Sequence, residues 1–269
     1  MLRHWLILLL AFAGPSTAQD QRPVLSLVID DLGYSFEHGK AAIELDGDHT
    51  YAVLPGASYS ERLARHANLL NKEVILHLPM QSISSSAAHE PGALNEAMDE
   101  DELTHNVHTL LAKIPFIRGV NNHMGSHLTE FDFFMRPVMD SIRSYNPSFY
   151  FLDSRTSPRS VAYSQAREAG LSSITRDIFL DNDANSAAIQ LQYNIWLERA
   201  RQQGSAIAIG HPYAPTIEVL QKNLAAAGVE FQFMRVSRLI QERQLRGFSP
   251  DWREQLSKLA ADGPVTLGQ

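Results

Sequence analysis

Two adjacent carboxylates, Asp30 and Asp31, stand at the end of an apolar run and are the residues best suited to chemistry. The run, residues 24–29, is aliphatic and partly β-branched, a pattern typical of a strand buried on both faces in a parallel sheet. Carboxylates there are costly to bury unless they meet a cation or a reacting group. Two interpretations stay open: one of them caps the next helix, or the pair acts at the carboxyl end of the strand, where α/β proteins bind their ligands.

Histidines follow several later apolar runs in the same way. His77 lies near the end of residues 73–81, and His123 and His127 lie in a glycine-containing turn after residues 117–121. His211 directly follows residues 206–210. A single histidine at a strand end is more often a structural hydrogen-bonding group than a ligand. The repetition favours a shared functional site.

Acids and arginines follow two further apolar runs. Asp153 and Arg155 come after residues 149–152, and Asp181 comes after residues 178–180. Either aspartate could orient an imidazole. Arg155 and Arg176 are candidate contacts for a substrate or for a neighbouring carboxylate.

The elements that must position these side chains alternate short apolar runs with longer amphipathic ones. Expected strands are 24–30, 51–54, 74–78, 117–121, 149–152, 173–175, 206–209 and 231–234. Expected helices are 58–70, 99–113, 133–143, 160–169, 185–203 and 216–226, with Gly204 and Gly228 as stop signals. Repeated βα units predict a parallel sheet, and about eight strands predict a closed or nearly closed barrel with its polar strand ends on one face.

Residues 1–18 have the features of a secretory signal: Arg3, an apolar stretch, and the small residues Ser16, Thr17 and Ala18. The stretch is too short to span a bilayer, and no other segment approaches the ~20 apolar residues that a span needs. We therefore expect a protein secreted across the inner membrane to the periplasm, with a retained N-terminal anchor as the alternative. Residues 19–246 would form one barrel domain, and residues 247–269 a peripheral helix and flexible tail.

The composition excludes several functions. The chain of 269 residues has no cysteine, which rules out disulfides, thiolate metal ligands and cysteine nucleophiles. The chain has 23 Lys and Arg residues against 30 Asp and Glu residues. Removal of residues 1–18 would take away Arg3 and make the net charge more negative. Such an acidic chain is a poor candidate for sequence-independent nucleic-acid binding. It also lacks a polybasic patch for a membrane surface.

Five phrases, in this order, resemble the divergent polysaccharide deacetylase family, a branch of the NodB-like carbohydrate esterases. They are Val-Ile-Asp-Asp-Leu-Gly (28–33), Leu-His-Leu-Pro-Met (76–80), Gly-Val-Asn-Asn-His-Met-Gly-Ser (119–126), Phe-Leu-Asp-Ser-Arg-Thr (151–156) and Ala-Ile-Gly-His-Pro (208–212). The resemblance implies an irregular (β/α) barrel, commonly of seven parallel strands. It also implies a divalent metal, usually zinc, that is held by one Asp and two His and activates water to attack an N-acetyl carbonyl of a carbohydrate polymer.

Carried over to this chain, the resemblance makes Asp30 the general base, Asp31 a metal ligand and His211 the general acid. The second motif of the superfamily is ordinarily His-x-x-x-His, and here only His123 and His127 have that spacing, later in the strand order than expected. The strand in the expected place ends in His77. The favoured ligands are therefore Asp31, His77 and His123, with His127 as the alternative third ligand.

The remaining candidates are assigned to substrate contact or to orientation of the ligands: Asn122, Asp153, Arg155, Arg176 and Asp181. The Arg-x-Pro motif of the superfamily is absent near the third strand.

Three functional classes follow from these residues. The first is a metal-dependent deacetylase acting on an N-acetylated envelope glycan, with peptidoglycan as the natural candidate; it predicts ligand atoms about 2 Å from one point. The second is a carbohydrate-binding or regulatory barrel without catalysis. The third is a glycoside hydrolase that pairs Asp30 with Asp153 or Asp181, with the two carboxyls about 5–9 Å apart.

Overall fold

The computed structural model describes residues 22–84 and 92–245. The expected signal at 1–18 and the expected helix and tail at 247–269 lie outside these residues, so the domain limits stay predictions. Within the described residues, no helix combines the length and apolar character needed to cross a membrane.

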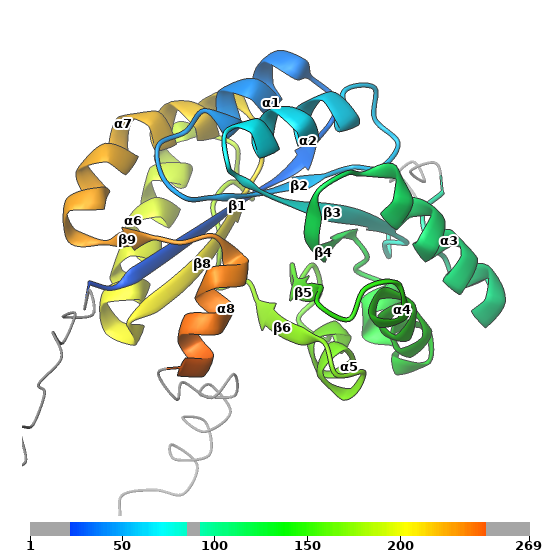
Figure 1. The fold of residues 1–269 in the computed structure, drawn as a ribbon. Coiled ribbons are helices and arrows are strands. Elements are labelled where there is room, and N and C mark those ends of the chain that lie inside the picture. Colours follow the sequence, from blue (N-terminus) through cyan, green and yellow to red (C-terminus); the bar gives the residue numbers. More distant parts are fainter. Residues whose placement is uncertain (1–21, 85–91, 246–269) are drawn as a thin grey trace, which may run out of the picture.

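A single sheet with all its strand pairs parallel forms the centre of the molecule (Figure 1). Its strands are β1 (Val24–Leu32), β2 (Thr50–Val53), β3 (Glu73–Met80), β4 (Ile117–Met124), β5 (Tyr150–Asp153), β6 (Ser172–Thr175), β7 (Ile178–Phe179), β8 (Ser205–Gly210) and β9 (Gln232–Phe233). The order is β6-β5-β4-β3-β2-β1-β8-β7, with β9 beside β1. Among the described residues no ladder joins β6 to β7, so the curved sheet is a half-barrel with an opening between these strands.

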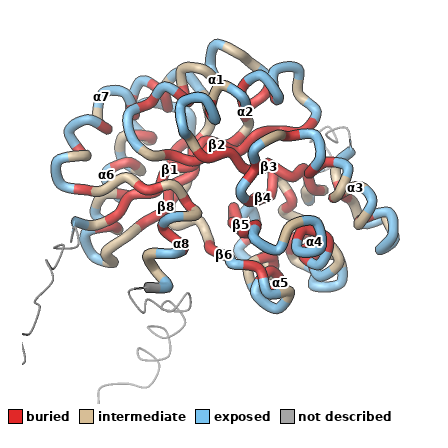
Figure 2. Tube along the Cα trace, in the orientation of Figure 1, coloured by how far each residue is buried: buried red, intermediate tan, exposed pale blue. Residues whose placement is uncertain are grey.

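Helices cover the outer face of the sheet, and the strands are buried along most of their length (Figure 2). The outer helices are α1 (Phe36–Ile43), α2 (Ser60–Leu69), α3 (Glu100–Lys113), α4 (Asp132–Tyr145), α5 (Ala162–Glu168), α6 (Ser186–Gln203) and α7 (Ala214–Glu230), with a 3₁₀ turn at Leu128–Glu130. The last described helix, α8 (Val236–Leu245), lies on the inner side.

The alternation of side chains along β1 explains why both of its faces are apolar. Leu25, Leu27 and Ile29 belong to the core between the sheet and the outer helices. Val24 and Val28 point into the half-barrel, where they share a smaller core with Val236, Leu239 and Ile240 of α8. The C-terminal described helix therefore fills the inside of the sheet.

The predicted parallel α/β fold is confirmed, with three differences in its elements. The helices α1 and α8 and the short strand β7 were not expected as regular elements. Gly204 ends α6 as predicted, in a left-handed conformation with φ 76°. Gly228 does not end α7, which continues to Glu230 and stops where Phe231 becomes extended before β9.

Candidate functional site

A break in β1 turns both carboxylates toward the same side of the sheet. Consecutive strand residues normally point to opposite faces. Here the pairing of β1 with β2 shifts between Ile29 and Leu32, and Asp31 has φ 57°. Bulges of this kind re-aim side chains next to active sites, and aspartate tolerates the left-handed region better than most residues. As a result, His77 Nε2 lies 3.7 Å from Asp30 Oδ2 and 3.2 Å from Asp31 Oδ1.

The helix-capping interpretation of these aspartates is wrong. The cap of α1 is Ser35, whose hydroxyl accepts a hydrogen bond from the backbone N–H of His38 at 3.3 Å. Both aspartates are thereby left to the site.

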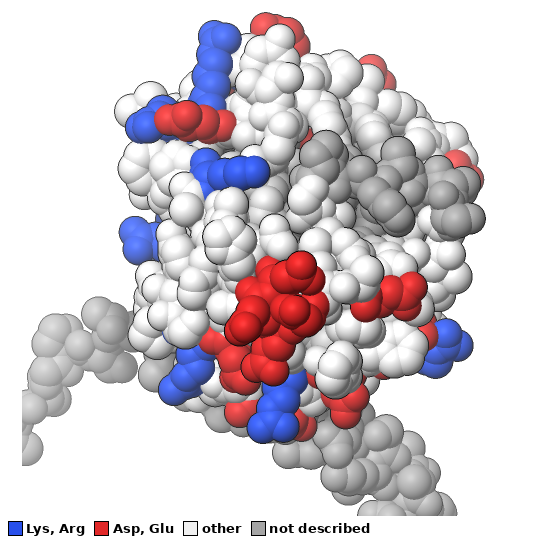
Figure 3. All heavy atoms as spheres, turned by 90° about the vertical axis from the view of Figure 1, so that its right-hand side faces the viewer, with Lys and Arg blue, Asp and Glu red and all other residues white. Residues whose placement is uncertain are grey.

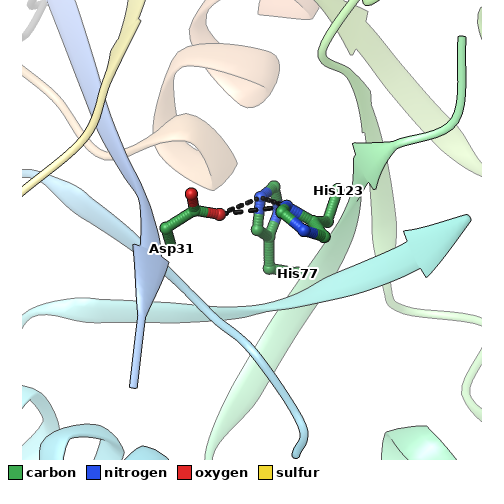
Figure 4. Close-up of side chains that lie close together, drawn as sticks. All are labelled: Asp31, His77 and His123. Carbon is green, nitrogen blue, oxygen red and sulfur yellow. Dashed lines mark hydrogen bonds and ion pairs between the residues drawn. The ribbon is translucent and has the colours of Figure 1, made fainter. Parts of the chain in front are cut away.

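Asp31, His77 and His123 bring one ligand atom each to a common point (Figure 4). Asp31 Oδ1 lies 3.0 Å from His123 Nδ1, and His123 Nδ1 lies 3.1 Å from His77 Nε2. The three residues come from the ends of β1, β3 and β4, which the parallel register aligns at one rim. These are the three residues that the sequence favoured as metal ligands, and their atoms lie close enough together to hold an ion.

Asn121 holds two members of the site and was missed by the sequence analysis. Its Nδ2 donates to Asp30 Oδ1 at 2.8 Å and to Ser154 Oγ at 3.2 Å. Its Oδ1 lies 2.8 Å from His77 Nδ1, its register partner on β3. The available signal was the period of two along β4, which puts Asn121 on the same face as His123.

The hydrogen bonds of His77 leave its Nε2 directed at the other candidate ligand atoms. Because Asn121 Nδ2 is used as a donor, its Oδ1 accepts the Nδ1 hydrogen of His77. With Nδ1 used as the donor, His77 Nε2 faces the Asp31 carboxylate at 3.2 Å, a contact that needs a positive charge: either a proton on Nε2 or a cation between the two atoms. Two imidazoles and one carboxylate, with an open position, are a donor set that suits zinc in catalytic sites.

The electrostatics of the site also favour a positive charge at this point. Burial by itself raises the pKa of the Asp31 carboxyl, but contacts with His123 and His77 outweigh burial and hold that pKa below its usual range. Burial opposes the charged form of His77 as well, yet the carboxylates of Asp30 and Asp31 raise the pKa of its imidazole.

Asp30 lies behind the ligand group and is almost fully buried, with 3% of its surface exposed. Burial raises the pKa of its carboxyl, and the charges of His77 and His211 and the Asn121 hydrogen bond only partly offset this. Its Oδ1 is fixed by Asn121, whereas Oδ2 faces His77.

His211 stands on the other side of Asp31, held by a buried aspartate. Asp181 accepts from the backbone N–H of His211 at 2.6 Å and lies 2.9 Å from its Nδ1. Thr216 Oγ1 donates to the same carboxylate at 2.8 Å. His211 Nε2 is thereby turned to within 3.8 Å of Asp31 Oδ2. Burial opposes protonation, but the hydrogen bond and charge of Asp181 raise the pKa of His211 to about 9.

A cavity of about 320 Å³ opens over these residues. Its walls include the ligand group, Asp30 and His211, together with Asn122, Arg155 and Arg176. Asn122 shapes the wall: its Oδ1 accepts from Ser154 N at 2.9 Å, and its Nδ2 donates to Met124 O at 2.9 Å.

Two predicted candidates take other positions. His127 is not part of the ligand group, because its Nε2 lies 2.7 Å from the exposed carboxylate of Glu96. Asp153 orients no imidazole; it accepts from Arg155 N at 2.7 Å and from Ser160 Oγ at 2.9 Å. Of the two aspartates proposed to orient a histidine, Asp181 does so.

Comparison with known proteins identifies the family. The model of the divergent polysaccharide deacetylase family matches residues 27–240. The chain belongs to the divergent polysaccharide deacetylases. Asp31, His77, His123 and His211 all lie inside the matched region. The family resemblance seen in the sequence is confirmed.

Relatives in other bacteria cover most of the chain. Uncharacterized protein YibQ of Escherichia coli K12 is 34% identical over 242 residues, which is 90% of this chain and 74% of YibQ. A protein of Haemophilus influenzae is 34% identical over 215 residues, 80% of this chain and 76% of its own length. A crystal structure of an uncharacterized protein from Agrobacterium tumefaciens C58 shares the fold, with a TM-score of 0.76 and 23% identity over 81% of this chain and 89% of that chain.

Proposed function

We propose that this divergent polysaccharide deacetylase is an exported, metal-dependent hydrolase that removes N-acetyl groups from an envelope glycan. The observation that carries the proposal is the convergence of Asp31, His77 and His123, with Asp30 and His211 on either side of them. The expected signal at residues 1–18 supports export to the periplasm, where peptidoglycan is the abundant N-acetylated polymer.

A divalent metal such as zinc, held by Asp31, His77 and His123, would polarise the amide carbonyl and lower the pKa of water toward ~7. Asp30 is placed to accept the proton of the attacking water, because Asn121 fixes Oδ1 and leaves Oδ2 toward the ligand group. His211 is placed to donate a proton to the departing nitrogen, because Asp181 holds Nδ1 and directs Nε2 into the cavity.

The proposal is tested first by the metal content of the full chain, purified without chelators or a histidine tag and measured by elemental mass spectrometry. We expect about one zinc or similar ion per chain. His77→Ala and His123→Ala should lose the metal. His127→Ala is the matched control and should retain it, since His127 pairs with Glu96. Stoichiometric metal in either of the first two variants would remove that histidine from the ligand set.

Acetate release from N-acetylated glycans then separates metal binding from turnover. His211→Ala should keep its metal and lose about 100- to 10,000-fold in rate, the usual contribution of a general acid or base. An unchanged rate would exclude the acid role. A metal-loaded wild-type protein that releases no acetate would instead indicate a glycan-binding or regulatory barrel.

A further inference from the structure

Two arginines, Arg155 and Arg176, form part of the wall of the same cavity as the ligand group. They come from different segments: Arg155 follows β5, and Arg176 lies in the connection between β6 and β7. The sequence left open whether they contact substrate or neighbouring carboxylates.

The Arg176 side chain is held in place by the backbone. Its Nε donates to Ser154 O at 2.7 Å, and its Nη2 donates to Arg155 O at 3.0 Å. Its guanidinium also lies 4.9 Å from the centre of the Phe179 ring. These contacts orient the guanidinium through backbone carbonyls and a ring, and the carboxylates of Asp30 and Asp153 act on its charge only from a distance, without a salt bridge.

The backbone at Arg155 is fixed in a conformation that non-glycine residues rarely adopt, with φ 49°. The N–H of Arg155 donates to Asp153 Oδ1, and Ser160 Oγ holds the other oxygen of that buried carboxylate. Such strain is typical of functional sites, where surrounding contacts maintain it.

Neither guanidinium forms an ion pair with a carboxylate among residues 22–84 and 92–245. Three other arginines do form close ion pairs: Arg159 with Glu130 at 2.6 Å, Arg201 with Glu230 at 2.6 Å, and Arg235 with Asp48 at 2.6 Å. Arg155 and Arg176 also place two like charges on the same cavity wall, and this repulsion is only partly offset by the carboxylates of Asp30 and Asp153.

The charges that line the cavity also favour the binding of an anion. Its wall carries the carboxylates of Asp30 and Asp31 and the guanidinium groups of Arg155 and Arg176, so a bound divalent cation leaves an excess of positive charge. The chain as a whole is acidic, with a formal net charge of −7, and a patch of Asp and Glu side chains lies on the side of α3 and α4 (Figure 3). Attraction for an anion is therefore local to the cavity.

We propose that the substrate carries an anionic group, a carboxylate or a phosphate, close to its N-acetyl group, and that Arg155 and Arg176 bind this anion. The inference rests on the proposed function for the N-acetyl part of the substrate. Guanidinium groups suit the role because their planar fork matches the oxygens of both anions.

The test compares sugars that differ in charge, using the full chain with zinc added and isothermal titration calorimetry. N-acetylglucosamine is the neutral probe, N-acetylmuramic acid adds a carboxylate, and N-acetylglucosamine 6-phosphate adds a phosphate. We expect at least one of the anionic sugars to bind about tenfold more tightly than the neutral sugar, the usual order for a charge-assisted hydrogen bond. Which anionic sugar binds more tightly identifies the chemical source of the anion.

Variants then assign the preference to the arginines. Arg155→Gln and Arg176→Gln should each reduce the ratio of anionic to neutral affinity about tenfold, and Arg155→Lys should restore part of it because it keeps the charge without the fork. Arg155 is exposed, so its replacement tests the proposal even if Arg176→Gln impairs folding. Arg118→Gln, at the exposed start of β4 and away from the cavity, is the matched control and should keep the full ratio.

Equal affinity for neutral and anionic sugars would overturn the inference, as would a preference that survives in both glutamine variants. These outcomes are separable from the proposed hydrolysis. Acetate release without an anion preference would remove the arginine subsite alone, and an arginine-dependent preference without acetate release would remove the hydrolase alone.

Discussion

At the scale of single residues, the sequence predicted which residue types form the site better than it predicted the hydrogen bonds between them. Asp30, Asp31, His77, His123 and His211 are visible because polar groups at the ends of apolar strands need a reason to be there. Asn121 could not be recognised in this way. It is followed by a second asparagine, Asn122, and nothing in the local sequence indicates which of the two faces the histidines. The register of β3 and β4 decides this, and register is a tertiary property.

Replacing Asn121 should therefore affect both the metal site and the fold. In Asn121→Ala, His77 Nδ1 and Asp30 Oδ1 lose their partner, so we expect zinc affinity to fall about 10- to 100-fold and unfolding free energy to fall by about 1–3 kcal/mol. Zinc titration against a chromophoric chelator and urea unfolding measure the two effects. Asn194→Ala, at an exposed position of α6, is the control and should change neither. Wild-type zinc affinity in Asn121→Ala would contradict the assigned role.

At the scale of elements, the strand at residues 24–30 was predicted, but its continuation to Leu32 with a bulge was not. A strand is recognised in a sequence by side chains that alternate between its two faces. The bulge breaks this alternation at the point where Asp31 contacts His77 and His123, and such tertiary contacts are not visible in the sequence. The turn that follows depends on Gly33, which has φ 141°. A Cβ on Gly33 would lie 2.7 Å from both Ala57 Cβ and Ser60 Oγ.

Gly33→Ala should destabilise the protein by about 1–3 kcal/mol, because alanine is strained at this φ and collides with the start of α2. Thermal and urea unfolding give the change. Gly56→Ala is the matched control in the adjacent loop, where a Cβ meets nothing within 4 Å, and it should leave stability nearly unchanged. Similar stabilities for the two variants would show that the turn is not constrained.

At the scale of the whole molecule, the two ends of the half-barrel have different roles. The site occupies the carboxyl ends of the strands, whereas buried polar groups at the opposite end tie the fold together. There Glu73 Oε1 accepts from Thr50 Oγ1 at 2.9 Å, Tyr150 OH at 2.9 Å and the Ser237 N–H of α8 at 3.1 Å. These contacts join β2, β3 and β5 to α8, the last helix that the structure describes. They depend on long-range packing and left no pattern in the sequence.

His49, directly before β2 and fully buried, makes the stability of the protein depend on pH. Burial lowers the pKa of its imidazole to about 4, and the nearby Lys72 adds to the effect. Between pH 4 and the ordinary value of about 6.5, the unfolded chain binds one more proton than the folded protein. Stability is therefore lost as pH falls through this window, by roughly 3 kcal/mol from this group.

Urea midpoints measured from pH 7 to pH 4 check this expectation. Other groups also titrate there, so the informative quantity is the difference from His49→Phe, which keeps a ring against Phe233 but cannot be protonated. The wild-type curve should fall more steeply by about one proton per molecule. Parallel curves would mean that His49 is not held neutral in the folded protein.

The opening between β6 and β7 affects how this architecture can diversify. Two residues, Arg176 and Asp177, cross it, and Asp177 is attached to β8 through Ile207: its N–H donates to Ile207 O at 2.9 Å and its Oδ2 accepts from Ile207 N at 2.9 Å. Because no ladder spans the opening in the described fold, lengthening this connection or changing its sequence breaks no pairing between β6 and β7. This part of the cavity wall is thus free to acquire a new specificity during evolution while the proposed metal ligands on β1, β3 and β4 keep their register.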